Sequence, residues 1–121
     1  MKKKYLALLT ALMLTAGIST GVQAAELKAL NTQQANIVTV AAFMAKGDLP
    51  NLKKSLATAL DNGMTVNQAK EVLVHLYAYT GFPRSLNALS TLNNLVQERK
   101  AAGINDEMGP DATPLDPSVD R

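Results

Sequence analysis

Residues 52–88 decide the fold of this chain: LKKSLATALDNGMTVNQAKEVLVHLYAYTGFPRSLNA. Within this stretch, Asn62-Gly63 ends one periodic apolar segment, because glycine readily adopts the left-handed conformation that follows many helices. Thr65 follows two residues after Gly63, with Gln68 three residues further on, which is the capping-box pattern of a helix start. The stretch therefore predicts the end of one helix and a second helix over about residues 65–80.

A tight connection, Gly81-Phe82-Pro83, follows that second helix. Proline disfavours helical geometry in the residue before it and suits the first turn of a helix that starts with it. We expect a further helix from Pro83 to about Ala102, ended by Gly103. Its predicted apolar face consists of Leu86, Leu89, Leu92, Leu95 and Val96.

Two more helices are expected upstream. One starts near Pro50, and its buried stripe is predicted to be Leu52, Leu56, Ala59 and Leu60. The other runs from about Thr32 to Lys46, where Asn31 and Gln34 have the capping-box spacing. The apolar face of this helix repeats at the helical period and consists of Ile37, Val40, Ala41 and Met44. Since no strand pattern occurs, the predicted fold is all-α, with about four helices around an antiparallel helix hairpin.

The segment Val72 to Tyr79 is apolar on nearly every side apart from His75, which is typical of a helix buried on several sides. So small a domain exposes much of its surface, and oligomerisation would help to stabilise it. We therefore expect some of this burial to come from another subunit.

The C-terminal residues 104–121 have a different character. Three prolines break any periodicity, and five acidic residues against one arginine give this segment a charge of −4, whereas residues 25–103 carry +3. This composition predicts a linker or a loosely docked tail.

The N-terminal residues 1–24 resemble a signal peptide. Three lysines precede an apolar run, and Val22, Gln23 and Ala24 suit cleavage after Ala24. The alternative is a membrane anchor, but the run is short for a bilayer span of roughly 20 residues. We expect export to the periplasm or secretion, with no stable membrane anchor after cleavage.

Composition excludes several classes of function. Cleavage after residue 24 leaves nine basic and ten acidic residues, so no basic surface for nucleic acid is predicted. The chain has no cysteine, which excludes thiol peroxidase chemistry and thiolate metal sites. A single histidine excludes a typical histidine-rich zinc site. We therefore predict neither a metal nor another cofactor.

One side of the predicted 65–80 helix carries the candidate chemistry. At 100° per residue, Glu71, His75 and Tyr79 fall on one stripe. A carboxylate one turn below an imidazole can hold it in one tautomer and support acid/base work. The Tyr79 hydroxyl can donate a hydrogen bond to a developing oxyanion, and Arg84 can hold a substrate carboxylate. The alternative is that all four residues are structural. His75 would then be a hydrogen-bonded core residue and Glu71 a solvated one, while Tyr79 would serve in packing and Arg84 would lie on the surface.

These residues resemble the core of the carboxymuconolactone decarboxylase-like proteins, which include the alkyl hydroperoxidase D branch. The similarity lies in Ala59-Leu60 and Gly63, in Glu71-Val72-Leu73-x-His75, and in Tyr79-x-Gly81-Phe82-Pro83. The resemblance implies an all-helical fold assembled as trimers or hexamers, with an active-site cleft near subunit contacts. It also implies His75 as the acid/base of a reaction in which a lactone acid loses carbon dioxide and a carbon is reprotonated.

The chain departs from the family at several positions. Ser55 stands where decarboxylase-like members often carry a second histidine, so we expect it to contact substrate and not to transfer protons. Leu76 stands where other members have a cysteine. The Cys-x-x-Cys pair of the alkyl hydroperoxidase D branch is missing, which excludes its peroxidase chemistry.

Two functional hypotheses follow. The first is a decarboxylase-like enzyme on a small lactone or carbonyl acid, with His75 and Glu71 as catalytic residues and Tyr79, Arg84 and Ser55 as substrate contacts. The second is a non-catalytic helical oligomer or binding module that kept the fold. The tail is expected to belong either to a one-domain protein or to a truncated reading of a longer, two-domain protein.

Overall fold

The computed structural model describes residues 29–118, and every regular element in that range is a helix. The elements are α2 (Thr32–Lys46), α3 (Leu49–Asp61), α4 (Val66–His75), α5 (Tyr77–Thr80) and α6 (Phe82–Ala101). The predicted all-α fold is therefore confirmed. The predicted signal peptide lies outside the described residues, and the first described residues, up to Ala35, form a unit separate from residues 36–118.

Both predicted capping boxes are present. The backbone N–H of Gln34 donates to Asn31 Oδ1 at 2.8 Å, and that of Asn31 donates to Gln34 Oε1 at 3.1 Å. Thr65 and Gln68 exchange the same pair of bonds at 3.2 and 3.0 Å. Each pair satisfies donors at a helix start that have no partner inside the helix.

The start of α3 uses a cap that the sequence analysis did not identify. Asp48 accepts from the backbone N–H of Asn51 at 3.3 Å and from its side-chain Nδ2 at 2.8 Å. These hydrogen bonds to Asn51, first the side-chain bond and then the backbone bond, lower the pKa of Asp48 below its ordinary value of 3.8.

Replacing this cap is expected to make stability less dependent on pH. A lowered pKa in the folded state stabilises the protein above the ordinary pKa, and this contribution is lost as the pH falls through the lowered value. We expect Asp48→Ala to melt at a lower temperature than the wild type at pH 7 and the gap to narrow below pH 3.8. Asp48→Asn, which keeps a capping oxygen, is the control. A gap that stays constant down to pH 2 would contradict the expectation.

The predicted helix over residues 65–80 is wrong in one respect, because it is broken at Leu76 into α4 and the short α5. The last carbonyls of a helix lack partners within it. Here the buried Ser85 hydroxyl, on α6, donates to the Leu73 carbonyl at 3.0 Å. Gly81 ends α5 with φ +87°, a backbone conformation that favours glycine. Phe82, which was expected to be non-helical, is the first residue of α6.

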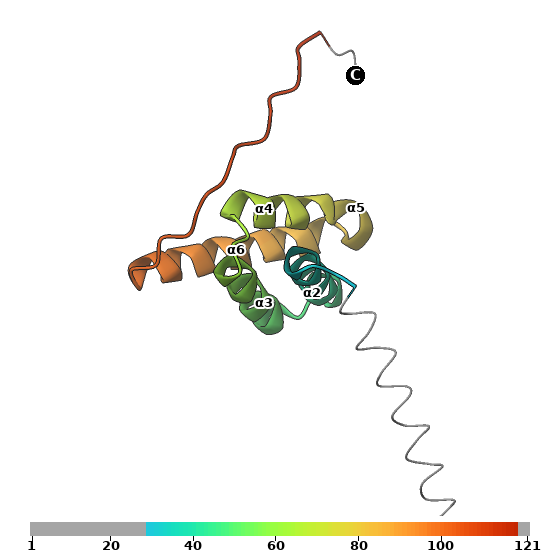
Figure 1. The fold of residues 1–121 in the computed structure, drawn as a ribbon. Helices are drawn as coiled ribbons and strands as arrows, with labels where there is room; N and C mark the ends of the chain where they lie inside the picture. Colours follow the sequence, from blue (N-terminus) through green and yellow to red (C-terminus); the bar gives the residue numbers. More distant parts are fainter. Residues whose placement is uncertain (1–28, 119–121) are drawn as a thin grey trace, which may run out of the picture. The chain divides into compact units, whose positions relative to one another are not determined.

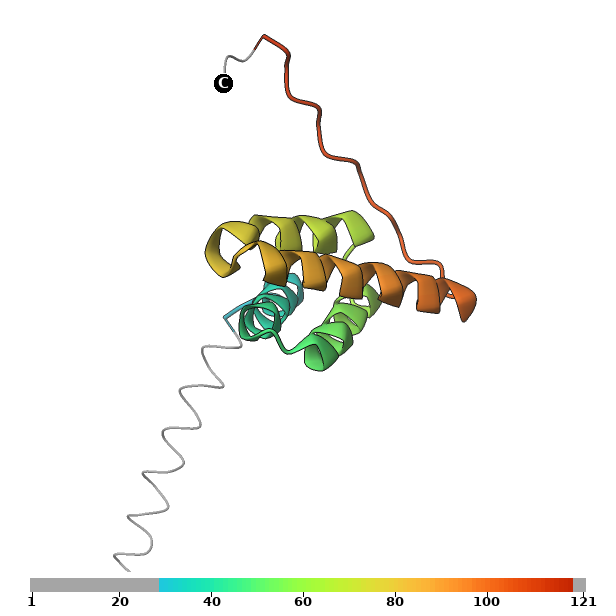
Figure 2. The same cartoon turned by 180° about the vertical axis from the view of Figure 1, so that it is seen from behind.

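Helix α6 is the element against which α3, α4 and α5 all pack. The chain runs out along α4 and α5 and returns along α6, so these elements form the predicted antiparallel hairpin (Figures 1 and 2). The predicted stripe of α3 is entirely buried, as are Val40 and Met44 of α2. On α6, Leu92 and Leu95 are buried, but Leu86 is exposed, which corrects its predicted place in the core.

Residues 104–111, here called the strap, dock on the start of α4. The backbone N–H groups of Val66 and Asn67 donate to the carbonyls of Glu107 and Met108, each at 2.9 Å. The Asn67 side chain also donates to the Gly109 and Pro110 carbonyls at 3.2 and 3.1 Å. The beginning of the predicted tail is therefore held by specific hydrogen bonds.

An arginine fixes the strap at its other end. Arg99 donates from Nε and Nη2 to both carboxylate oxygens of Asp106, at 2.9 to 3.1 Å, and from Nη2 to Asp61 at 2.8 Å. The side chains of Arg99 and Asp106 are only 12% and 7% exposed. The hydrogen bonds to Asp106 and then to Asp61 raise the pKa of Arg99 above its usual range, so it stays charged.

Candidate functional site

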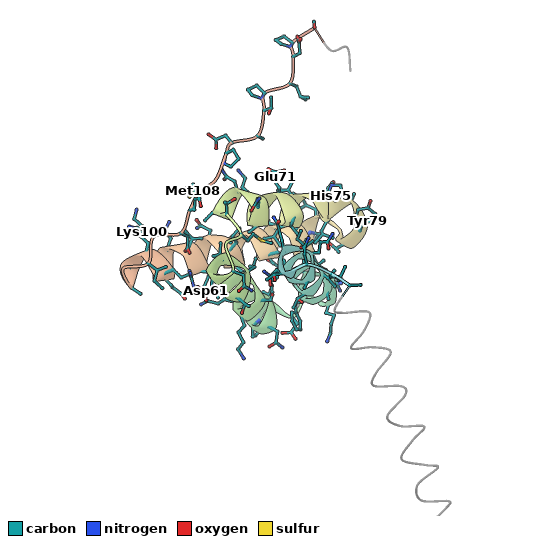
Figure 3. The ribbon with its side chains drawn as sticks, in the orientation of Figure 1. Asp61, Glu71, His75, Tyr79, Lys100 and Met108 are labelled. Carbon is teal, nitrogen blue, oxygen red and sulfur yellow. The ribbon has the colours of Figure 1, made fainter. Side chains whose placement is uncertain are left out.

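Glu71, His75 and Tyr79 follow one another along α4 and α5 (Figure 3). All three side chains are exposed, and Tyr79 is 77% exposed. The rings of His75 and Tyr79 lie 6.0 Å apart between centroids and are tilted by 46°. The helical period therefore brings the imidazole and the phenol together, although Leu76 breaks the helix between them.

Glu71 does not orient His75 within residues 29–118, because no hydrogen bond or ion pair joins them there. The Glu71 side chain is exposed one turn before the imidazole. Glu71 and His75 can still form a hydrogen bond when substrate excludes water, since catalytic hydrogen bonds often tighten only in the complex with substrate.

Arg84 has a structural partner that the sequence did not reveal. Its Nη1 donates to the carbonyl of Ala45, in the last turn of α2. A positive charge is favourable there, because the C-terminal carbonyls of a helix carry partial negative charge. The predicted carboxylate clamp is thus partly occupied, and four of the five guanidinium N–H donors remain for other partners.

Ser55 is also engaged within its own helix. Its hydroxyl donates to the carbonyl of Leu52 at 2.9 Å, and the side chain is half-buried. Among the residues that the structure describes, no hydrogen bond links Ser55 to His75, Tyr79 or Arg84. The structure therefore brings His75 and Tyr79 into ring contact and gives Arg84 and Ser55 partners elsewhere.

Two ring pairs are recorded along α4, α5 and the start of α6: His75 with Tyr79, and Tyr77 with Phe82. The exposed apolar residues of this region are here called the aromatic surface: Val74, Tyr77, Tyr79, Phe82 and Leu86. Phe82 is 61% and Tyr77 53% exposed, and their rings meet edge to face at 6.1 Å. The burial predicted for Val72 to Tyr79 is thus only partial in the described chain, since Val74, Tyr77 and Tyr79 are exposed. That another subunit covers part of this segment stays a prediction.

The sequence profile of the carboxymuconolactone decarboxylase family matches residues 9–94. The chain belongs to this family. The match includes His75, the aromatic surface and the whole motif from Ala59 to Pro83 on which the resemblance was based. It also begins inside the segment predicted as a signal peptide and leaves that prediction untested. No curated protein and no solved structure matches the chain.

Two further observations concern metal ligands and membrane-spanning helices in this carboxymuconolactone decarboxylase family member. Within the described range, no three histidine, cysteine, aspartate or glutamate side chains gather as metal ligands would. No helix of that same range is both long and apolar enough to span a membrane.

Proposed function

We propose that this member of the carboxymuconolactone decarboxylase family is a homo-oligomeric lyase that transfers a proton on a small lactone or carbonyl acid, with His75 as the acid and base. The observation that carries the proposal is the position of the chain's single histidine, which is exposed and in ring contact with Tyr79. Imidazole is the side chain most often used to give and take protons in enzymes.

A second copy of the chain would complete the site. Contiguous exposed apolar surface on a small domain marks an interaction or ligand-binding region. Covering His75 and Tyr79 with another subunit would place them in an enclosed, water-poor space, where electrostatic interactions are stronger. We propose a trimer or hexamer, in which each subunit supplies one such surface.

In the proposed reaction, the bond between the carboxylate carbon and the ring carbon breaks and carbon dioxide leaves. The electron pair stays on the ring carbon, conjugated with the lactone carbonyl, and protonated His75 delivers a proton to the conjugated system. Tyr79 donates to the carbonyl oxygen as negative charge develops there. Glu71 positions the imidazole, and the remaining N–H groups of Arg84 bind the substrate carboxylate, with Ser55 as a further contact.

The test is a matched pair of variants assayed for carbon dioxide release from a small γ-lactone carboxylic acid. We expect His75→Gln to lower turnover by a factor of about 100 to 10,000, the range for removal of a general acid or base. Because His75 is exposed, we expect the variant to keep its fold and helical signal. Lys54→Gln, at an exposed position on α3, is the control. Unchanged turnover in His75→Gln would refute the proposed role.

A non-catalytic oligomeric module is the second candidate, favoured by the partners of Arg84 and Ser55 and by the missing bond between Glu71 and His75. The nuclear magnetic resonance (NMR) ring signals of the single histidine separate the two hypotheses. Signals that shift on adding the lactone acid, in an assembly confirmed by sedimentation, support the enzyme. Ring signals that do not shift with any lactone acid, in an assembly of the same mass, support the non-catalytic module.

We also propose that the protein acts in the periplasm or outside the cell, as the sequence of its first 24 residues suggests.

A further inference from the structure

A groove lies between α4, α6 and the strap, along the C-terminal half of α6. It has a volume of about 460 Å³, within the range of small-molecule sites. Its apolar lining includes Leu92, Val96, Ile104 and Met108, of which the last two belong to the strap. Figure 3 shows Met108 beside the start of α4 and Lys100 near the end of α6. None of the residues assigned to the proposed reaction lines this groove.

The lining of the groove carries more positive than negative charge. Lys70 from α4 and Lys100 from α6 line it and are exposed, and their side chains make no hydrogen bond or ion pair in the described stretch of the chain. Asp106 is the acidic residue in the lining, and its two carboxylate oxygens are bound by Arg99. The groove therefore offers two unpaired positive charges at the edge of an apolar cavity.

We propose that this groove binds a free monocarboxylic acid with an apolar body, such as a medium-chain alkanoate. The carboxylate binds at the mouth of the groove, where Lys70 and Lys100 supply positive charge, and the alkyl chain lies on Leu92, Val96, Ile104 and Met108. Lysine is suited to this task, since its ammonium is a compact charge on a flexible stem that can reach the mouth of the groove. Asn93 and Gln97, which also line the groove, supply further amide donors.

The strap supplies one wall of the site, so binding depends on its docking. Ile104 and Met108 contribute apolar surface only while Arg99 holds Asp106 and the start of α4 holds the Glu107 and Met108 carbonyls. A bound acid therefore stabilises the docked strap, because a ligand that binds one of two states shifts the population toward it.

Octanoate is the probe, used with the full-length protein and followed by NMR of the methyl groups of Leu92, Val96, Ile104 and Met108. We expect these signals to shift to saturation, while the signals of Leu52, in the core, stay in place. Octan-1-ol tests the apolar body without the charge, and acetate tests the charge without the body. Both are expected to bind at least about tenfold more weakly than octanoate, since each lacks one of the two interactions.

Two variants locate the site. Lys70→Gln with Lys100→Gln is expected to weaken octanoate binding about tenfold, as two solvent-exposed ion pairs are lost, and Lys54→Gln is expected to leave it unchanged. Gln97→Trp, at an exposed position of the lining, fills the groove without disturbing the core and is expected to abolish binding.

Three results would overturn the proposal: octan-1-ol binding as tightly as octanoate, the double lysine variant binding as well as Lys54→Gln, or no saturable shift at millimolar octanoate. The proposal would also be overturned if the methyl signals shifted with protein concentration but not with octanoate, because the groove would then bind a second copy of the chain. The outcome is independent of the proposed lyase activity, because His75→Gln leaves the groove intact and is expected to bind octanoate normally.

Discussion

Replacing Arg99 with methionine is expected to lower the free energy of unfolding by about 2–3 kcal/mol. Removing one partner of a buried ion pair costs about 3–5 kcal/mol, because the other charge is left without compensation. Asp106 would be that charge, with its side chain only 7% exposed. We expect a smaller loss than the full penalty, since the strap can lift and return the carboxylate to water.

Urea unfolding at one fixed protein concentration measures this loss, since assembly would make stability depend on concentration. Lys53→Met is the matched control, because Lys53 pairs with Glu98 at 2.6 Å but the two side chains are 40% and 59% exposed. Exposed pairs contribute about 0–1 kcal/mol. Arg99→Met with Asp106→Leu should recover most of the stability, since no buried charge remains. Equal losses in Arg99→Met and Lys53→Met would show that the Arg99 cluster is an ordinary surface pair.

Gly109→Ala is expected to detach the strap. Gly109 has φ +76°, and a Cβ atom there would lie 2.6 Å from the Cβ of Thr65, the residue that caps α4. Backbone strain of a left-handed alanine costs about 1–2 kcal/mol, and the clash with Thr65 adds about 1–3 kcal/mol by analogy with overpacked cores. Lifting the strap relieves both, which limits the loss, and we expect about 2 kcal/mol. The lifted strap leaves the amides of Val66 and Asn67 open to rapid hydrogen exchange.

Gly103→Ala separates the two contributions. Gly103 has φ +84°, close to that of Gly109, but a Cβ atom there would meet nothing within 4 Å. This variant therefore carries only the conformational cost. Gly109→Ala should be less stable than Gly103→Ala, and only Gly109→Ala should expose the two amides. If both variants lost the same stability and protected those amides equally, the close passage of the strap over Thr65 would be unimportant.

The sequence predicted helix starts well because their signals are local. Asn31 with Gln34 and Thr65 with Gln68 are three residues apart, and each pair makes both bonds of its capping box. The break at Leu76 could not be predicted in this way. It accompanies a hydrogen bond from Ser85 to the Leu73 carbonyl, which depends on how α6 packs against α4.

The candidate site was predicted only partially, for the same reason. The helical period indicated that His75 and Tyr79 are neighbours, and their rings are 6.0 Å apart. It could not show that Arg84 binds the Ala45 carbonyl, 39 residues away in sequence. Apolar composition predicted burial for Tyr77 and Tyr79, but composition does not reveal whether the cover comes from the same chain. The catalytic roles of His75 and Glu71 and the binding roles of Tyr79, Arg84 and Ser55 remain predictions.

The strap also has a consequence for the order in which this protein folds. The first turn of α4 is completed by carbonyls about 40 residues later in the chain, and closing so long a loop has an entropic cost that a local helix cap does not. We expect α3, α4 and α6 to pack first and the strap to dock in the last step. In the native protein the same contact should then be the first to open, as a local unfolding event that leaves the helical core intact.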